Sequence, residues 1–252
     1  QKPSLDTQYN GGVKASDNWN QVCNGGRAYG AMAIYEDEPE LAATIINRAI
    51  ESVKLPMKEY GPNGAYPEGY GYWGYGTSYN VMLISALEKA FGTDFRLPAM
   101  KGFLQTAGFM ENMTGPSHSP FNFFDAGSGE ELNPAMFWFA DKLKDPSLLW
   151  VERNHVKDSE AKKYVRNTLL PAIMIWSKGI MLNKIPAPAS NMWVGAGRNP
   201  VALMRSSWSD TDIYIGFKGG SHSLNHGHVA VGAFVIDAYG GGGEVGCGVQ
   251  DV

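Results

Sequence analysis

Residues 62–92 read PNGAYPEGYGYWGYGTSYNVMLISALEKAFG and combine two kinds of sequence. Residues 62–80 hold five tyrosines, one tryptophan and five glycines, more than core packing requires, and predict an aromatic loop. Residues 78–92 carry apolar side chains at helical spacing, and Gly92 follows the last of them as a helix-ending residue. The stretch therefore predicts a glycine-rich loop that leads directly into a helix.

Helices separated by glycine- and proline-rich loops are predicted through much of the chain. They cover residues 27–37, 40–55, 134–143, 145–154 and 160–179. We expect Pro171 to kink or interrupt the last of them. Helix, glycine-rich aromatic loop, helix is typical of an α/α toroid, in which each helix pair buries its apolar face against its neighbours. We therefore predict an α/α toroid domain over residues 1–190, incomplete at its N-terminal end.

A second domain of a different kind is predicted over residues 191–252. Apolar or alternating runs bounded by turn residues predict three strands, at residues 201–208, 212–220 and 228–240. Three strands form too little sheet to close a sandwich, so we expect this β domain to be incomplete at its C-terminal end and the chain to be a fragment. The predicted fold class is α+β, with more than one domain.

Composition argues against several classes of protein. Of the 252 residues 44% are hydrophobic and 18% charged, against roughly 25% charged in an average domain, so the chain can bury a sizeable core. The net charge of -4 and the pI near 5.7 differ from the clustered basic charge of nucleic-acid-binding domains, and no such partner is expected. Apolar runs such as residues 169–176 fall short of the roughly 18 residues that cross a bilayer, so no membrane span is predicted.

The tyrosine-rich stretch is the first candidate for a binding site. Tyr70, Tyr72 and Trp73 offer flat apolar faces with a polar edge, which suit stacking against sugar rings. The alternative interpretation is a rigid aromatic loop that only caps the toroid.

A second polar and aromatic segment, residues 17–26, reads DNWNQVCNGG and directly precedes a predicted helix. Its amides, Asn18, Asn20 and Asn24, and the ring of Trp19 are candidates for substrate binding. Asparagine side chains also cap helices and turns, and that purely structural role is the alternative for each of them.

Three of the five histidines lie in the segment SHSLNHGHVAVG, residues 221–232, at His222, His226 and His228. On a strand, the last two would point to the same face. They could share a metal ion, or one could face substrate while the other is structural. A complete metal site needs further ligands, and Asp237 and Glu244 are the only acids close by in the downstream sequence.

Two carboxylates in glycine- and aromatic-rich segments, Glu68 and Asp125, would be the candidates if the chain were a glycoside hydrolase. No spacing rule pairs these two acids. Glu68 could equally brace its own tyrosine-rich segment.

Three separated motifs, in this order, resemble the heparinase II/III-like family of polysaccharide lyases. They are NWNQVCNGG (18–26), GAYPEGYGYWGYGTSYNVMLISALEKAFGTDF (64–95) and RSSWSDTDIYIGFKGGSHSLNHGHVAVGAFVIDAYGG (205–241). The resemblance implies a bacterial, periplasmic or secreted enzyme. It also implies that the α/α toroid is followed by an antiparallel β-sandwich, of which the chain holds the start, with the active site between the two.

The resemblance also implies roles for particular residues. Asn18 would neutralise the carboxylate of a uronic acid, with Asn20 and Asn24 as neighbours that could take the same role. Tyr75 would be the catalytic tyrosine and His226 the catalytic histidine.

His228 would be a zinc ligand in the sheet domain by the same resemblance. The aspartate that completes this zinc site in the family is replaced here, because Val245 or Gly246 stands at the matching place. Zinc is therefore a weaker expectation than the lyase reaction.

The expected reaction is β-elimination from an acidic polysaccharide that contains uronic acid. Loss of the C5 proton puts charge beside a carboxylate, so donors must first cancel that charge. Either His226 is the base and Tyr75 the acid on opposite faces of the ring, or Tyr75 takes both roles on one face. The alternatives are a non-catalytic glycan-binding member of the fold, or a hydrolase that uses Glu68 and Asp125.

Capture of a polyanion by a chain with an acidic pI should depend on a few basic residues. The candidates are Arg27, Arg198, Arg205 and Lys218, and Arg205 is the one that we assign to substrate binding. Each of them alone could also be an ordinary solvated charge.

Overall fold

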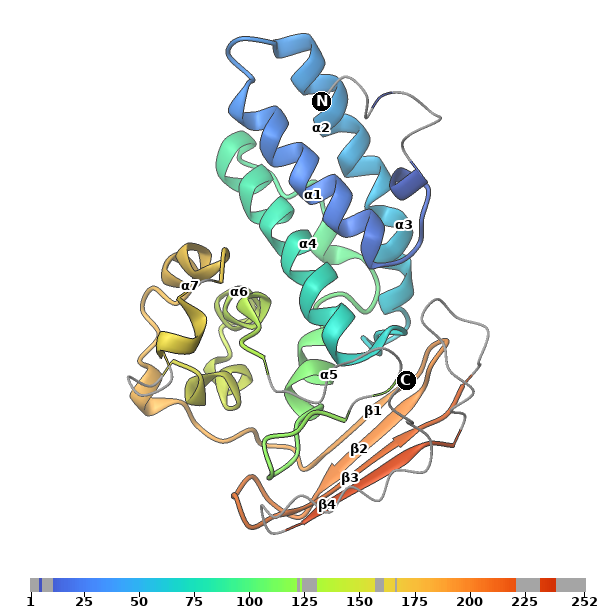
Figure 1. The fold of residues 1–252 in the computed structure, drawn as a ribbon, viewed down its shortest axis with the longest axis vertical. Helices are drawn as coiled ribbons and strands as arrows, with labels where there is room; N and C mark the ends of the chain where they lie inside the picture. Colours follow the sequence, from blue (N-terminus) through green and yellow to red (C-terminus); the bar gives the residue numbers. More distant parts are fainter. Residues whose placement is uncertain are drawn as a thin grey trace.

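The computed structural model describes residue 5 and residues 11–121, 123, 131–156, 161–165, 167–220 and 232–238. The α-helices are α1 (Asn18–Ala33), α2 (Pro39–Ser52), α3 (Lys54–Met57), α4 (Gly69–Phe91), α5 (Thr106–Asn112), α6 (Pro134–Leu143) and α7 (Leu170–Trp176). The strands are β1 (Met192–Gly195), β2 (Val201–Arg205), β3 (Ile213–Lys218) and β4 (Phe234–Ala238). The predicted α+β class is confirmed at this level: helices come first, and an antiparallel sheet follows (Figure 1).

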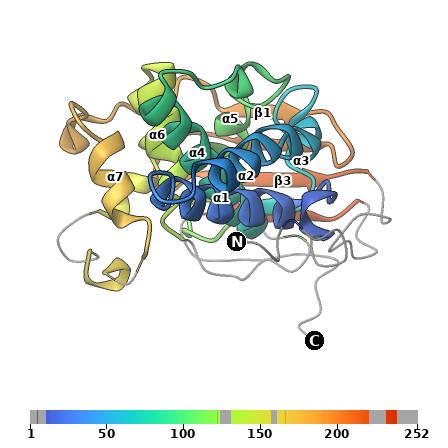
Figure 2. The same ribbon diagram turned by 90° about the horizontal axis from the view of Figure 1, so that it is seen from above.

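Helices α1, α2 and α4 lie side by side, with α6 and α7 to one side of them (Figures 1 and 2). The closest approach is between α1 and α4, at glycines. A Cβ atom added at Gly76 of α4 would lie 2.8 Å from Cβ of Asn18 and would also collide with Oε1 of Gln21. On α1, a Cβ added at Gly25 would lie 3.0 Å from the backbone oxygen of Tyr79. Glycine is therefore used here for close packing of two helices.

The prediction of an aromatic loop over residues 62–80 is wrong for most of this stretch. Helix α4 begins at Gly69, nine residues before the predicted helix at residue 78, and ends as predicted at Gly92, whose φ is 69°. Glycine has a weak helix propensity, but packing of α4 against α1 outweighs it. The polar segment 17–26 is likewise helical, since α1 starts at Asn18 and its N-cap Asp17 accepts a hydrogen bond from the backbone of Trp19.

Two further helix predictions change in the structure. Pro171 lies in the first turn of α7, where a missing N–H costs nothing, so it begins the helix and does not kink it. The helix predicted over residues 145–154 is instead two short 3-10 turns, η5 (Pro146–Leu149) and η6 (Glu152–Asn154). By contrast, α6 has the bounds that the sequence predicts.

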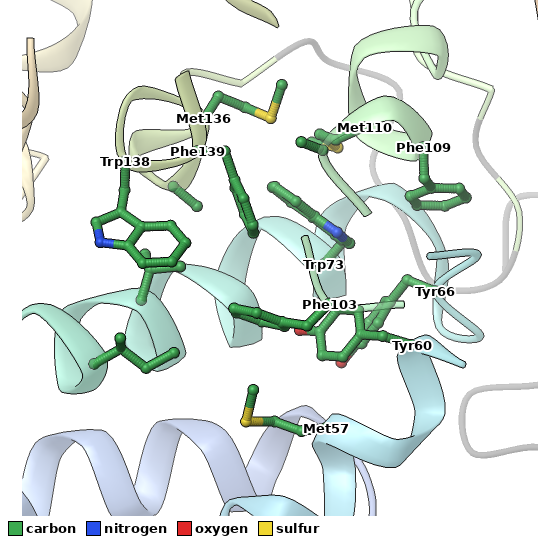
Figure 3. Close-up of a cluster of buried hydrophobic side chains, with 14 of the residues drawn as sticks. Met57, Tyr60, Tyr66, Trp73, Phe103, Phe109, Met110, Met136, Trp138 and Phe139 are labelled. Atoms are coloured by element: carbon green, nitrogen blue, oxygen red, sulfur yellow. The ribbon is translucent and has the colours of Figure 1, made fainter. Parts of the chain in front are cut away.

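The core beneath α4 is built from aromatic rings and methionines (Figure 3). Its largest fully buried side chains include Trp73, Tyr60, Tyr66, Phe103, Phe109, Phe137 and Phe139. The ring centre of Phe103 lies 5.1 Å from that of Tyr60 and 5.5 Å from that of Phe139, and the rings are inclined to each other. Burial of such rings supplies most of the hydrophobic stabilisation of a core and fixes its geometry through edge-to-face contacts.

The four strands form one antiparallel sheet in the order β1-β2-β3-β4. The strands predicted at residues 201–208 and 212–220 are present as β2 and β3, and β4 covers the described part of the third prediction. Strand β1 was missed, because MWVG is only four residues long and lies between Pro188 and Pro200. The last helical turn ends at Lys184 and the first strand begins at Met192, so the change from helix to strand falls near residue 190.

One face of this sheet packs on the helical part. Trp193 of β1 lies against α5, with its ring 5.6 Å from the ring of Phe109, and a Cβ added at Gly108 would lie 2.9 Å from its indole nitrogen. Polar side chains share this inner face, including Arg205, Lys218 and Asp237.

The outer face of the sheet is apolar. Its exposed side chains include Met192, Val194, Met204, Ile213, Phe217 and Ile236. The outer face is thus apolar, whereas a sheet whose far side meets water carries polar side chains there. In the described part of the chain, no helix is both long enough and apolar enough to cross a membrane.

We predict that Gly76→Ala destabilises the protein by about 1–3 kcal/mol, because the added methyl group overpacks the contact between α1 and α4. Gly26→Ala is the matched control, since it lies within α1 and a Cβ there meets nothing within 4 Å. Relief of the glycine penalty should make that variant about 1 kcal/mol more stable. Urea denaturation of both variants measures the difference, and equal effects would contradict the packing argument.

Candidate functional site

A cleft of about 200 Å³ lies beside the central part of α4. Its walls come from α4, from the segment that leads into α6 and from the segment that precedes α7. The lining residues are Gly74, Tyr75, Ser78, Tyr79, Glu131, Leu132, Asn133, Pro134, Asn167, Thr168 and Leu169. Tyr75, Ser78 and Tyr79 are spaced i, i+3, i+4 and therefore lie on one face of the helix. Most of these residues offer hydroxyl, amide or ring surfaces, which suit a ligand rich in hydroxyl groups.

Tyr75 and Tyr79 are the titratable side chains of α4 that line this cleft, and Tyr75 is the more exposed of the two. Tyr75 is 47% exposed, and its ring stands edge-on to the ring of Tyr79 at 5.5 Å between centroids. Burial of part of the side chain, followed by the nearby Tyr79 and Cys23, raises the pKa of the Tyr75 phenol above its usual value of 10. At neutral pH this phenol is protonated and can donate a hydrogen bond or a proton.

The wall opposite Tyr75 is centred on Asn133. Its backbone N–H donates to Oε2 of Glu152 at 3.0 Å, and its side-chain amide donates to the backbone oxygen of Glu131 at 2.8 Å. The same amide lies 3.2 Å from the hydroxyl of Tyr70, which also bonds the backbone of Glu131. Gly74 lets the side-chain oxygen of Asn133 approach α4, because a Cβ atom at that glycine would collide with it. These contacts fix the wall rigidly.

Ser78 is a lining residue that sequence reasoning missed. It is 2% exposed, and in the described part of the chain its hydroxyl has no hydrogen-bond partner. A buried hydroxyl without a partner costs free energy, and a ligand or water in the cleft would supply one. Its spacing of three residues from Tyr75 was the available signal, but the prediction of a loop concealed it.

Asn18 and Glu68 form a buried pair where α1 begins. The carboxylate of Glu68 accepts the backbone N–H of Asn18 at 2.9 Å and the side-chain amide of Asn18 at 2.9 Å. The hydroxyl of Tyr66 donates to the same carboxylate at 2.8 Å. Negative charge is favoured at a helix N-terminus, so Glu68 stabilises the start of α1 and orients the Asn18 amide. Its place supports the bracing interpretation of this acid.

Gln21 continues this buried network to α4. Its amide donates to the hydroxyl of Tyr60 at 2.8 Å, which lies 2.7 Å from the hydroxyl of Thr77. Burial raises the pKa of Tyr60, and burial together with the charge of Glu68 raises the pKa of Tyr66, so both phenols stay neutral.

The other two asparagines of the first motif face the interior. Asn20 and Asn24 are 0% exposed, and both donate to the hydroxyl of Ser52 on α2, at 3.1 Å and 2.9 Å. Asn20 also donates to the backbone oxygen of Ala15 at 2.8 Å. These amides join α1 to α2 and to the preceding segment, which is the structural role that the sequence left open.

The aromatic candidates for stacking differ in accessibility. Trp19 is 56% exposed and Tyr72 is half-buried. Tyr70 and Trp73 are buried, and the indole of Trp73 donates to the hydroxyl of Thr106 at 2.8 Å. Of these four rings, Trp19 is the most open to a sugar.

The basic candidates are placed in four different environments. Arg198 pairs on the surface with Glu59 at 3.3 Å. Arg27 lies within α1 and has a buried guanidinium nitrogen. Lys218 is 0% exposed, and burial lowers its pKa. Arg205 donates to the backbone oxygen of Thr114 at 2.8 Å on the inner face of the sheet.

Arg205 also lies close to Glu111 of α5, a buried acid whose Oε1 has no hydrogen-bond partner in the described part of the chain. Burial, followed by the charge of Asp145, raises the pKa of Glu111 to about 7, and the charge of Arg205 opposes this rise. Glu111 is therefore partly protonated near neutral pH.

Several candidate residues lie outside the described residues: His222, His226, His228, Asp125 and Glu244. Across the described ranges, no group of three or more histidine, cysteine, aspartate or glutamate side chains could hold a metal ion. Asp237 is described, and its Oδ2 accepts hydrogen bonds from the backbone and hydroxyl of Ser117, at 2.9 Å and 2.6 Å. Zinc stays a prediction.

Comparison of the chain with models of known protein families and with curated proteins finds no match.

We predict that Glu68→Gln destabilises the protein by about 1–3 kcal/mol, because an amide NH₂ then faces the donors of Asn18 and Tyr66. Glu51→Gln is the control, since Glu51 is an exposed acid paired only with Lys54 and should change stability by less than about 1 kcal/mol. Chemical denaturation at neutral pH compares the two variants. A Glu68→Gln protein as stable as its control would remove the bracing role.

A pH dependence follows from Glu111. Its folded pKa of about 7 exceeds its usual value of 4.5, so the folded state binds the proton more tightly than the unfolded state. The resulting stability is fully present below pH 4.5 and is lost as the pH rises through 7, by about 3 kcal/mol in total. In Glu111→Gln this loss should disappear, whereas in Glu40→Gln, an exposed acid, it should persist. Denaturation midpoints measured at several pH values from acid to neutral give this loss of stability. Parallel plots of midpoint against pH for all three proteins would contradict the assignment.

Proposed function

We propose that the protein is a polysaccharide lyase that cleaves an acidic polysaccharide by β-elimination beside a uronic acid. The observation that carries the proposal is Tyr75: a half-exposed, protonated phenol on a cleft that also holds the buried hydroxyl of Ser78, which has no hydrogen-bond partner among the described residues. The order of the three sequence motifs supports it. We place the enzyme in the periplasm or outside the cell by the same resemblance.

In the proposed reaction, a base removes the C5 proton of the uronate, the bond between C4 and O4 breaks, and a double bond forms between C4 and C5. Tyr75 donates its proton to the leaving O4. A phenol with a raised pKa favours this acid role over that of a base, because it holds its proton at neutral pH. His226 is then the base, on the opposite face of the sugar ring.

Asn18 is the proposed neutraliser of the uronate carboxylate. Its side chain is 4% exposed and does not line the cleft of Tyr75, so the assignment rests on the sequence motif. One hydrogen of its amide nitrogen is directed to Glu68 at 2.9 Å, and only the second hydrogen is left for substrate. Glu68 then acts as a positioning residue that holds the amide in one orientation. A fixed donor pays no reorganisation cost when charge develops in the transition state.

The finer description of the fold belongs to the same proposal. Helices α1, α2, α4, α6 and α7 would form part of an α/α toroid, and the sheet would be one layer of an antiparallel β-sandwich. The apolar outer face of the sheet supports the second statement, because that face is what a second sheet would cover. The polar inner face would border the substrate groove.

The hydrolase alternative is less well supported. Both carboxylate oxygens of Glu68 accept hydrogen bonds at the start of α1, and the side chain is 3% exposed. An acid that serves as a catalytic group must reach the glycosidic bond. The bracing role accounts for this residue without catalysis.

The proposal is tested on a panel of polysaccharides containing uronic acids, by the ultraviolet absorbance of the unsaturated product. We expect turnover by the wild type and a loss of about 100-fold or more in Tyr75→Phe. Tyr35→Phe, an exposed tyrosine outside the cleft, should keep full activity.

Three outcomes would contradict the proposal. Binding of glycans without turnover would indicate a non-catalytic member of the fold. Products without a double bond would indicate a hydrolase. Full activity in Tyr75→Phe would remove the tyrosine from the mechanism.

A further inference from the structure

A second, smaller cavity lies where the helical part meets the loop between β2 and β3. Three segments line it: residues 114–118 after α5, residues 150–154 around η6, and residues 205–210 at the end of β2. It shares no lining residue with the cleft of Tyr75. Its volume of about 30 Å³ would hold one or two water molecules or a single small polar group, and is far too small for a sugar ring.

Two arginines enter this cavity, and each is stacked on a tryptophan. The guanidinium carbon of Arg153 lies 3.3 Å from the ring centre of Trp150, and that of Arg205 lies 3.6 Å from the ring centre of Trp208. The ring centre of Tyr214 lies 5.2 Å from the guanidinium carbon of Arg205. Stacking holds a guanidinium by its face and leaves the N–H groups at its edge directed outward.

Each guanidinium is also fixed by one backbone oxygen. Arg205 donates to Thr114 at 2.8 Å, and Arg153 donates to Trp150. In the described part of the chain these are the only hydrogen bonds of either guanidinium. Side chains held in this way lose little further entropy when they bind a ligand.

The acids near the two arginines do not form ion pairs with them. Among the described residues, no carboxylate oxygen lies within 4.0 Å of a nitrogen of Arg153 or Arg205. Asp210 lines the cavity and acts on Arg153 only through its charge.

Around Arg205, three acids are buried, Glu111, Asp212 and Asp237. Asp212 accepts hydrogen bonds from the hydroxyl of Ser206 and the backbone of Ser207, and Asp237 accepts from Ser117. None of the three lines the cavity. The two guanidinium edges therefore remain for an added anion.

We propose that this cavity binds one oxyanion group, a carboxylate or a sulfate. Two arginine forks supply paired N–H donors that match the oxygens of such a group, and the imidazole of His118 lies in the same lining. The rings of Trp150 and Trp208 each cover one face of a guanidinium, so its N–H edges are the groups left to bind an anion. The site shares no residue with the cleft of Tyr75, so anion binding here does not require the lyase reaction and would occur equally in a non-catalytic protein.

The test is calorimetric titration of the full chain with sodium sulfate and with sodium acetate, at constant ionic strength set by chloride. Tryptophan fluorescence gives a second readout, because Trp150 and Trp208 contact the arginines. We expect saturable binding, weakened about tenfold or more in Arg153→Gln. Arg96→Gln removes an exposed arginine that lines neither cavity and should bind as the wild type does.

A second variant and two further ligands test the same proposal. Arg153→Lys, which keeps the charge but loses the fork, should weaken binding while circular dichroism shows an unchanged fold. Titration with glucuronate and with a sulfated glucosamine separates a free anion from an acidic group on a sugar, since tighter binding of either sugar would assign the site to a glycan. Absence of saturable binding by all four anions, or equal binding by wild type and Arg153→Gln, would overturn the proposal whatever the outcome of the lyase assay.

Discussion

The hydrogen bonds between the Glu68 carboxylate and the first residue of α1 join the two longest helices in the described part of the chain. This carboxylate comes directly before α4 and ends at the N-terminus of α1, where three donors surround it. The contact sets the position of one helix along the other, and Gly76 then allows them to touch. Tyr75, the residue before Gly76 on α4, is exposed and lines the cleft. The candidate site therefore depends on a buried charge that does not itself line the cleft.

The sheet also buries charged groups, because several of its charged side chains lie on the inner face, toward the helices. Arg205, Lys218 and Asp237 face the helices, whereas methionine, valine, isoleucine and phenylalanine side chains face outward. Burial of charge is costly unless hydrogen bonds compensate for it, and Arg205 and Asp237 each bind a residue of the segment that follows α5. The boundary between helices and sheet therefore holds several buried charged groups, and the smaller cavity lies there, whereas the cleft of Tyr75 lies within the helical part.

Sequence patterns predicted the class and order of the elements, because α2, α6, β2 and β3 have clear apolar periods. They failed over residues 17–26 and 62–80, where asparagine, glycine and tyrosine predict loops and packing of one helix on another decides the outcome. The same failure concealed Ser78 as a lining residue of the cleft, whereas the structural role of Asn20 was one of the two alternatives that the sequence left open. Tyr75 is assigned from its motif and does line the cleft. Asn133 has no local signal, since only the tertiary fold brings it to Glu152 and the cleft, and the same holds for the meeting of Arg153 with Arg205 in the smaller cavity.

Glu152 lies in a short turn, residues 151–153, that contacts both cavities. Its carboxylate holds the backbone of Asn133, a wall of the larger cleft, while its neighbours Val151 and Arg153 line the smaller cavity. An occupant that displaced this turn from one side would also move a residue that holds or lines the other cavity. Thermodynamic linkage then requires the effect to be mutual. If an occupant of one cavity changes the affinity of the other cavity by some factor, an occupant of the other cavity changes the affinity of the first by the same factor. A turn of three residues would thereby couple two binding equilibria.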